Sequence, residues 1–310
     1  MFPNSEYSFH LVLARVENGE LTIVDKLKER VRLASGLDEK GSLSEASQSE
    51  ALLCLERFGH RLAHIDKSHV RVVGTNTLRK AKNADAFVQR AEKVIGQQVE
   101  IISGLEEARL IHSGVANLFS QTGENYLIVD IGGGSTECII GRDRNMQHAD
   151  SFYMGCVEFS NQYFSKSKWS RKDFDRAVTA ARLQMGPVQR VYRELGWTHA
   201  FGSSGTVNAV SEILNHQGFG QVITRSGIDW LFGYLQGAKS VDALDLPGLK
   251  PERAPVIVGG VCILWALFHS LKLREMRPVQ TALREGVLNE LANIEGQSDV
   301  REHSVSKLMK

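Results

Sequence analysis

The chain has 310 residues, of which 42% are hydrophobic and 24% charged, and its formal net charge is +1. This length predicts one large or two medium domains, and the composition is that of an ordinary water-soluble globular protein. A nearly neutral chain has no overall field that would draw it to nucleic acid or to a membrane surface, so a polyanionic ligand would have to be attracted locally.

The composition also predicts the compartment. Four scattered cysteines without a CxxC pair exclude the usual zinc spacing and predict reduced thiols. No basic segment followed by an apolar stretch opens the chain, so we expect a cytoplasmic protein without an export signal. The uncharged segment 255–271 is shorter than the roughly 20 residues that cross a bilayer. Its double glycine favours a buried core helix over a membrane span.

The first elements in chain order are two strands and a helix. The pattern of residues 9–16 and 21–26 predicts antiparallel strands joined by a turn at 17–20. Ser44 is a typical N-cap and predicts the start of a helix that reaches Ala63.

A second helix between two short strands follows. Residues 70–74 and 99–102 are apolar and β-branched enough to predict strands. Asn83 predicts the cap of the intervening helix, and Gly96 predicts its end.

The next helix begins with two adjacent glutamates. Ser103 and Glu106 match the S-x-x-E capping box, which gives Glu106 a structural role at the helix start. Glu107 is left without such a role, although solvated glutamates are common in first turns. The polar segment 116–125 then breaks the periodicity. We place a domain boundary there, with domains at 1–117 and 118–300 and a polar tail at 301–310.

The segment 126–137 is the most informative of the chain. Five residues, Tyr126 to Asp130, predict a buried strand that ends in a carboxylate, and three glycines follow at Gly132–Gly134. Glycine permits positive φ and close backbone approach to a ligand, and consecutive turn amides can hold a phosphate. Residues 135–140 suit the second strand of a hairpin, unlike a Walker or Rossmann loop, which opens a helix. A tight hairpin without a ligand is the alternative.

A second glycine loop supports phosphate recognition. Residues 202–206 read Gly-Ser-Ser-Gly-Thr and precede the helical segment 207–214. Small hydroxyls and free amides at a helix start attract anions, although such turns also occur without any ligand.

Six short motifs in order resemble the exopolyphosphatase/pppGpp phosphohydrolase (Ppx/GppA) family of the actin-like ATPase superfamily. They cover nearly the whole chain: residues 74–79, 102–109, 128–137, 154–157, 202–206 and 282–286. Within the family, Gly134 and residues 246–249 resemble the exopolyphosphatase branch, since the guanosine branch tends to have alanine at the position of Gly134.

The resemblance implies an α/β fold of two actin-like (ribonuclease H-like) domains with a cleft between them. It implies that Glu107 is the general base and that Asp130 and Glu137 hold a divalent cation, Mg²⁺ by preference. It also implies phosphate binding by Arg79 and by the two glycine loops. The implied phosphate ligands are Ser8, Arg79, Gly132, Gly133, Gly134, Ser135, Gly202, Ser203, Gly205 and Thr206.

The N-terminus departs from the family pattern, in which a strand ends in D-x-G-S-N-S. Of that motif only Ser8 matches, and Pro3 stands at the aspartate position. The strand that carries the motif lies centrally in an actin-like sheet. We therefore expect two neighbouring strands to lack a partner, from either a lost start or a degenerate sequence.

The leading hypothesis from the sequence is an exopolyphosphatase that releases terminal phosphates from inorganic polyphosphate. The alternatives are a pppGpp 5′-phosphohydrolase, a catalytically impaired module that binds phosphate or alarmone, and, least favoured, an ATPase of the sugar-kinase type. The expected partners are polyphosphate or pppGpp, with no nucleic acid, and a homodimer is possible.

Overall fold

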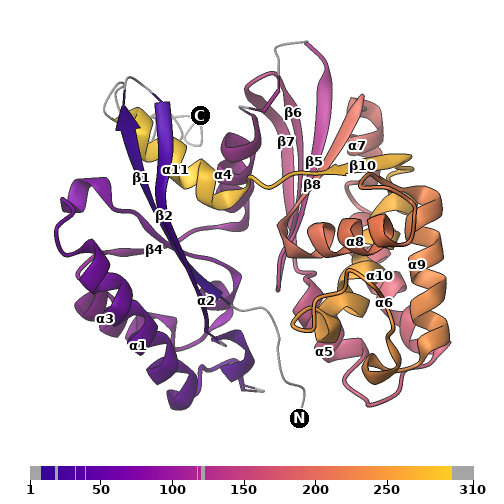
Figure 1. Cartoon of the computed structure of the whole chain (residues 1–310), viewed down its shortest axis with the longest axis horizontal. Helices are drawn as coiled ribbons and strands as arrows, with labels where there is room; N and C mark the ends of the chain where they lie inside the picture. Colours follow the sequence, from indigo (N-terminus) through magenta and orange to yellow (C-terminus); the bar gives the residue numbers. More distant parts are fainter. Residues whose placement is uncertain are drawn as a thin grey trace.

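The computed structural model of the chain describes residues 8–17, 20–31, 33–38, 40–116, 118–119 and 123–294. Two α/β halves lie side by side, and the C-terminal helix returns to the first half (Figure 1). The predicted tail at 301–310 and the divergent residues 1–7 lie outside the described residues.

The first half contains β1 (Ser8–Glu17), β2 (Glu20–Arg30), α1 (Glu45–Leu62), β3 (Val72–Gly74), α2 (Asn76–Lys80), α3 (Ala84–Ile95), β4 (Val99–Ile101) and α4 (Gly104–Ala116). The second half contains β5 (Asn125–Ile131), β6 (Thr136–Arg142), β7 (Asn145–Phe152), α5 (Cys156–Tyr163), α6 (Arg171–Met185), α7 (Gln189–Leu195), β8 (His199–Ser203), α8 (Ser204–His216), β9 (Ile223–Thr224), α9 (Arg225–Ala238), α10 (Ala254–Ser270) and β10 (Glu275–Pro278), and the last helix is α11 (Leu283–Ile294).

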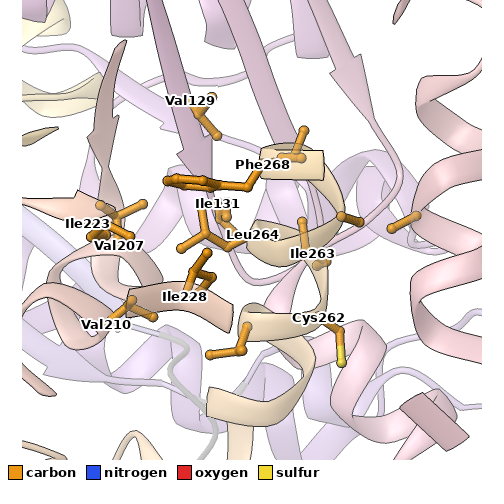
Figure 2. Close-up of a cluster of buried hydrophobic side chains, with 14 of the residues drawn as sticks. Val129, Ile131, Val207, Val210, Ile223, Ile228, Cys262, Ile263, Leu264 and Phe268 are labelled. Carbon is orange, nitrogen blue, oxygen red and sulfur yellow. The ribbon is translucent and has the colours of Figure 1, made fainter. Parts of the chain in front are cut away.

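One continuous sheet organises the second half. Its strand order is β7-β6-β5-β8-β10-β9, with β5 antiparallel to β6 and parallel to β8. Leu264 and Phe268 of α10 pack with Val129 and Ile131 of β5 in a large buried cluster (Figure 2). The apolar segment 255–271 is therefore a core helix, as predicted. No helix in the described part of the chain is both long enough and apolar enough to cross a membrane.

The first half differs, because its described strands do not join into one sheet. β1 pairs antiparallel with β2, and β3 pairs parallel with β4, as two separate sheets. This division agrees with the expectation that two neighbouring strands lack a partner.

Local sequence sets the ends of the helices in this half. The Ser44 side chain accepts a hydrogen bond from the amide of Ser47 at 3.3 Å, and Gly96 ends α3 with a φ of 73°. Asn83 precedes α3 as predicted, but its side chain bonds the backbone of Leu43 instead of capping the helix. Asn83 therefore occupies the predicted N-cap position, but it makes no side-chain capping hydrogen bond.

A cavity of about 1180 Å³ lies between the two strand pairs and continues into the cleft between the halves. Apolar residues of α1, α3 and α11 line it, together with the whole of 8–16 and 69–78. The cavity therefore joins the interior of the first half to the edge of the second.

Helices α4 and α11 connect the halves through a close crossing. A Cβ on Gly114 would overlap the backbone of Ala282, and one on Gly286 would overlap the carbonyl of Leu110. On its other side, α4 packs through Ile111 against the β5–β6 hairpin. Because α4 is held on both sides, the first turn of this helix has a fixed place at the cleft.

Candidate active site

The glycine-rich segment forms the turn of the β5–β6 hairpin, as predicted. The amide of Gly132 donates to the carbonyl of Ser135 at 2.9 Å and closes the turn. The amides of Cys156 and Val157, at the start of α5, donate to the carbonyls of Gly132 and Gly133 at 2.9 and 3.0 Å. These bonds fix the loop, and the cleft end of the cavity is lined by Gly132, Gly133, Gly134 and Ser135.

Close packing, and not a left-handed turn, requires the glycine at Gly134. None of Gly132–Gly134 has a positive φ. A Cβ on Gly134 would overlap the side-chain amide of Asn76, and one on Gly155 would overlap the carbonyl of Gly133. The loop lies between α2 and the start of α5, so Gly134 is required by a contact across the cleft.

Asp130 lies at the end of β5, beside the parallel strand β8. The register places it opposite Ser203, and the carboxyl ends of parallel strands are where ligands bind in α/β sheets. The hydroxyls of Ser203 and Ser204 donate to the two carboxylate oxygens at 2.5 and 2.6 Å. Burial raises the pKa of Asp130, and the two hydroxyls oppose that rise. The carboxylate is thus held rigidly at the cleft, which it lines.

Glu107 is paired with Arg79 on the side of the first half that faces the cleft. Nη1 of Arg79 donates to Oε2 of Glu107 at 2.8 Å and to the carbonyl of Ile102 at 2.9 Å. Burial raises the pKa of the Glu107 carboxyl, while Arg79 lowers it and the nearby Asp130 raises it. Glu107 lines the cavity but Arg79 does not. The arginine is therefore directed at the glutamate, and its predicted phosphate contact stays a prediction.

The capping box that separated the two glutamates is only half present. The amide of Glu106 donates to the Ser103 hydroxyl at 3.1 Å. The Glu106 carboxylate bonds Arg109 at 2.7 and 2.8 Å and lies 3.6 Å from Arg71, so it does not return to the helix start. Glu106 has a structural role in an ion-pair network, and Glu107 has a partner that the sequence did not indicate.

Glu137 lies opposite Asp130 in the hairpin, because the two residues are register partners. Its side chain is 1% exposed and accepts a hydrogen bond from the Ser151 hydroxyl at 2.8 Å. Burial, and then the charges of Glu107 and Asp130, raise the pKa of Glu137 well above its usual range. Three acidic side chains from two halves thus form one electrostatically coupled cluster.

The cluster suits a hard divalent cation only in part. Within the described ranges, no three His, Cys, Asp or Glu side chains are grouped closely enough to hold a metal by themselves. Mg²⁺ commonly takes one or two carboxylates and completes its shell with water and substrate phosphates. Asp130 on the cleft wall, with Glu137 buried behind it, fits that smaller donor set, and a cation would relieve the repulsion between the carboxylates.

The second glycine loop contributes less to the cleft than predicted. Gly202 lies within β8, where a Cβ would meet Val207 at 2.7 Å, and both Ser203 and Thr206 are buried. Gly205 is the one predicted residue of this loop that lines the cavity. Phosphate contacts by Gly202, Ser203 and Thr206 stay predictions, and their position shows a role in packing and in holding Asp130.

Several residues that line or adjoin the cleft were not predicted from the sequence. Ser204 has a φ of 68°, an uncommon conformation for serine, and it directs its hydroxyl to Asp130. The guanidinium of Arg253 lies against Gly205, and burial lowers the pKa of Arg253 to about 10. Arg284 lines the same cavity, and the motif at 282–286 was the signal that could have identified it. No sequence motif marks Arg253.

Ser8, the predicted first-loop phosphate ligand, lies at the start of β1. It lines the cavity, and its hydroxyl hydrogen-bonds Nε2 of His10 at 2.7 Å. The other ring nitrogen of His10 lies 3.3 Å from a guanidinium nitrogen of Arg284. Ser8, His10 and Arg284 thus lie together at one end of the cleft, called here its basic end. A phosphate contact by Ser8 stays a prediction.

Comparison with known proteins identifies the family of the chain. The Ppx/GppA phosphatase family matches residues 12–295. The chain is 39% identical over 298 residues to the guanosine-5′-triphosphate,3′-diphosphate pyrophosphatase of Vibrio campbellii, which covers 96% of this chain and 60% of that protein. The protein of the same name from Pseudoalteromonas translucida is 40% identical with the same coverage. The chain therefore spans about three fifths of the length of these relatives.

Solved structures show the fold. An exopolyphosphatase from Cytophaga hutchinsonii superposes with a TM-score of 0.82 at 23% identity, covering 92% of this chain and 95% of that one. The Aquifex aeolicus Ppx/GppA family member gives a TM-score of 0.77 at 23% identity, with 94% and 96% covered. The fold is α/β and actin-like, as predicted, and the chain belongs to the Ppx/GppA phosphatase family.

Proposed function

We propose that the chain is a pppGpp 5′-phosphohydrolase in which Glu107 activates the attacking water. The observation that carries the proposal is a buried carboxylate of raised pKa on the cleft wall, paired with Arg79 and facing Asp130. A base whose pKa is raised towards neutrality is better matched to proton transfer at physiological pH.

The remaining parts follow the needs of phosphoryl transfer, which asks the protein mainly for positioning and charge neutralisation. Asp130 and Glu137 would hold Mg²⁺, which would neutralise charge on the phosphates. The 132–135 loop and Gly205 border the same space and offer backbone groups to phosphate oxygens. Arg79 restrains Glu107, so that its carboxylate keeps one orientation towards the cleft.

The comparisons favour pppGpp as the substrate, whereas the leading hypothesis from the sequence was polyphosphate. The relatives with about two fifths identity carry the guanosine name, whereas the exopolyphosphatase structure is similar at a level that supports the fold alone. Gly134, which suggested the exopolyphosphatase branch, has a packing reason in this structure, since Asn76 occupies the space of its missing Cβ. The glycine at this position therefore has a structural reason that does not depend on the substrate.

The test compares phosphate release from pppGpp and from long-chain polyphosphate in the presence of Mg²⁺. We expect faster release from pppGpp, and Glu107→Gln should lower turnover by roughly two to four orders of magnitude. Glu106→Gln is the matched control, because the neighbouring side chain belongs to an ion-pair network away from the cleft.

The alternatives have distinct outcomes. Faster release from polyphosphate would return the assignment to an exopolyphosphatase. Calorimetric binding of pppGpp without turnover, equal in wild type and Glu107→Gln, would identify an impaired binding module. Equal loss of turnover in the Glu106 and Glu107 variants would contradict the role of Glu107 as base.

A further inference from the structure

The side-chain oxygen of Asn76 is a buried acceptor without a donor. Within the described ranges it is one of two buried side-chain polar atoms that no hydrogen bond satisfies, and the other is the Thr281 hydroxyl. Of these two residues only Asn76 lines the cavity. A buried acceptor is costly to leave unpaired, so a donor that does not belong to the chain is expected to bind it.

Asn76 lies beside the candidate base. Its side-chain amide occupies the space that a Cβ on Gly134 would need, so the residue reaches from α2 to the glycine loop. Arg79 lies three positions further along α2 and donates to Glu107 at 2.8 Å. Residues three positions apart share one face of a helix. The face of α2 that carries Asn76 is therefore the face that meets Glu107, and both Asn76 and Glu107 line the cavity.

A water molecule that attacks a phosphate has two protons to place. If two acceptors hold them, both O–H bonds point away from the phosphorus and a lone pair of the water is directed at it. Glu107 supplies one acceptor. Asp130 is less suited to be the other, because each of its carboxylate oxygens already accepts a serine hydroxyl. Arg79 can only donate. The unpaired oxygen of Asn76 meets the requirement.

We propose that Asn76 is a second catalytic residue, whose side-chain oxygen accepts one proton of the attacking water while Glu107 accepts the other. The inference rests on the proposed function, in which Glu107 activates this water. A bond forms between the water oxygen and the terminal phosphorus, and the bond from this phosphorus to the bridging oxygen breaks. The electron pair of the broken bond leaves with the shortened nucleotide. One proton passes to Glu107, and the proton held by Asn76 stays on the released orthophosphate.

The first test is Asn76→Leu, which keeps the branched shape of the side chain and removes the acceptor. With pppGpp and Mg²⁺, kcat should fall by roughly ten- to a hundredfold, because the water loses its orientation. KM should stay within about twofold, since the lost contact is to water and not to the substrate. The melting temperature of the unliganded variant should be equal or higher, because an unsatisfied buried acceptor has been removed.

Asn76→Ala separates catalysis from packing. The smaller side chain leaves room for a water molecule, which can accept the proton in place of the amide oxygen. The loss of kcat should therefore be smaller in Asn76→Ala than in Asn76→Leu. A role in packing against Gly134 alone predicts the reverse order, because truncation removes more contacts than the change to leucine.

Asn208→Leu is the matched control. Asn208 lines the same cavity, but its side-chain oxygen already accepts a hydrogen bond from Nε2 of Gln280 at 3.1 Å. Removal of this partnered oxygen should leave kcat within about twofold of wild type. All variants are also assayed with polyphosphate, so the comparison does not depend on which substrate is preferred.

Combination with Glu107→Gln tests whether both residues act on one water. If they do, the double variant should be about as slow as Glu107→Gln alone, because effects on a shared step do not multiply. Losses that multiply would overturn the proposal, as would an unchanged kcat in Asn76→Leu. A raised KM at unchanged kcat would overturn it too and would place Asn76 on the substrate. Low turnover in Glu107→Gln with wild-type turnover in Asn76→Leu would refute this inference alone, whereas full turnover in Glu107→Gln would refute the proposed function.

Discussion

The two halves of this molecule differ in how far their described strands are joined into one sheet. In the second half, six strands form one sheet, and α10 is buried against it along most of its length (Figures 1 and 2). In the first half, four described strands form two separate pairs with a cavity between them. The comparison teaches that helices of the right pattern can form and pack while the described strands beneath them are not joined into one sheet.

The candidate site is built mainly on the second half, whose strands form one sheet. Asp130 and the 132–135 loop belong to the complete sheet. Glu107 belongs to the first half in sequence, but it lies on α4, which packs against the second sheet and against α11. The incomplete sheet therefore leaves the acidic cluster assembled, and its effect is expected first on stability and on the basic end of the cleft.

The largest difference is expected when a core phenylalanine is truncated in each half. Phe268 is fully buried in the continuous core, and Phe58 is 3% exposed but borders the cavity. Phe268→Ala should lower the free energy of unfolding by about 3–5 kcal/mol, the usual cost of a large cavity in a tight core. Phe58→Ala should cost about 1–2 kcal/mol, because one side of its ring already lacks contacts. Urea denaturation measures both, and equal costs would contradict the comparison.

A pH titration of stability tests the packing around α4. His112 is buried, its Nε2 lies 3.0 Å from the Tyr126 hydroxyl, and burial lowers its pKa to about 4. Between pH 6.5 and 4 the unfolded chain binds this proton and the folded chain does not, so the free energy of unfolding falls as the pH falls through that window. The contribution of His112 to this loss should be about 3 kcal/mol and should level off below pH 4.

His112→Gln should flatten that slope while keeping a side-chain donor for Tyr126. His10, whose pKa is also lowered to about 4, should maintain the remainder. The slope is measured by urea denaturation at closely spaced pH values. A slope that is the same in wild type and variant would mean that α4 is not packed as described.

Short sequence patterns predicted much of the fold, but they could not predict contacts between residues that are far apart in the chain. The hairpin at 126–140, the Ser44 cap and the core helix at 255–271 each depend on a few neighbouring residues, so the sequence pattern sufficed. The pair formed by Arg79 and Glu107 joins residues 28 positions apart and has no local pattern.

The second glycine loop shows a limit of local composition. Phosphate contacts by Gly202, Ser203 and Thr206 stay predictions, because small residues suit close packing as well as ligand approach. In the folded chain Gly202 faces Val207 within the core, and Ser203 serves Asp130. Only the tertiary position separates those two uses of the same residues.

A smaller effect is expected from Asp130→Asn, which tests whether Asp130 holds the cation. The substitution removes a charge and replaces one acceptor of the Ser203 and Ser204 hydroxyls with a donor. The Mg²⁺ concentration for half-maximal phosphate release should rise by roughly tenfold, equivalent to about 1.4 kcal/mol. Glu106→Gln serves as the control with an unchanged titration. A Mg²⁺ titration of Asp130→Asn that matches wild type would mean that the glycine loop is only a hairpin turn without a ligand.

The last predicted effect has opposite signs in the two halves. Ala91 and Ala177 are both buried alanines on helices, α3 and α6, but only Ala91 lines the cavity. Ala177→Leu adds three carbons to a filled core and should destabilise the chain by about 1–3 kcal/mol. Ala91→Leu adds the same atoms beside empty space and should stabilise it by about 0.5–1 kcal/mol, as cavity-filling changes do. Thermal and urea unfolding of the two variants give the signs directly. Destabilisation of equal size in both would mean that the first half is packed as tightly as the second.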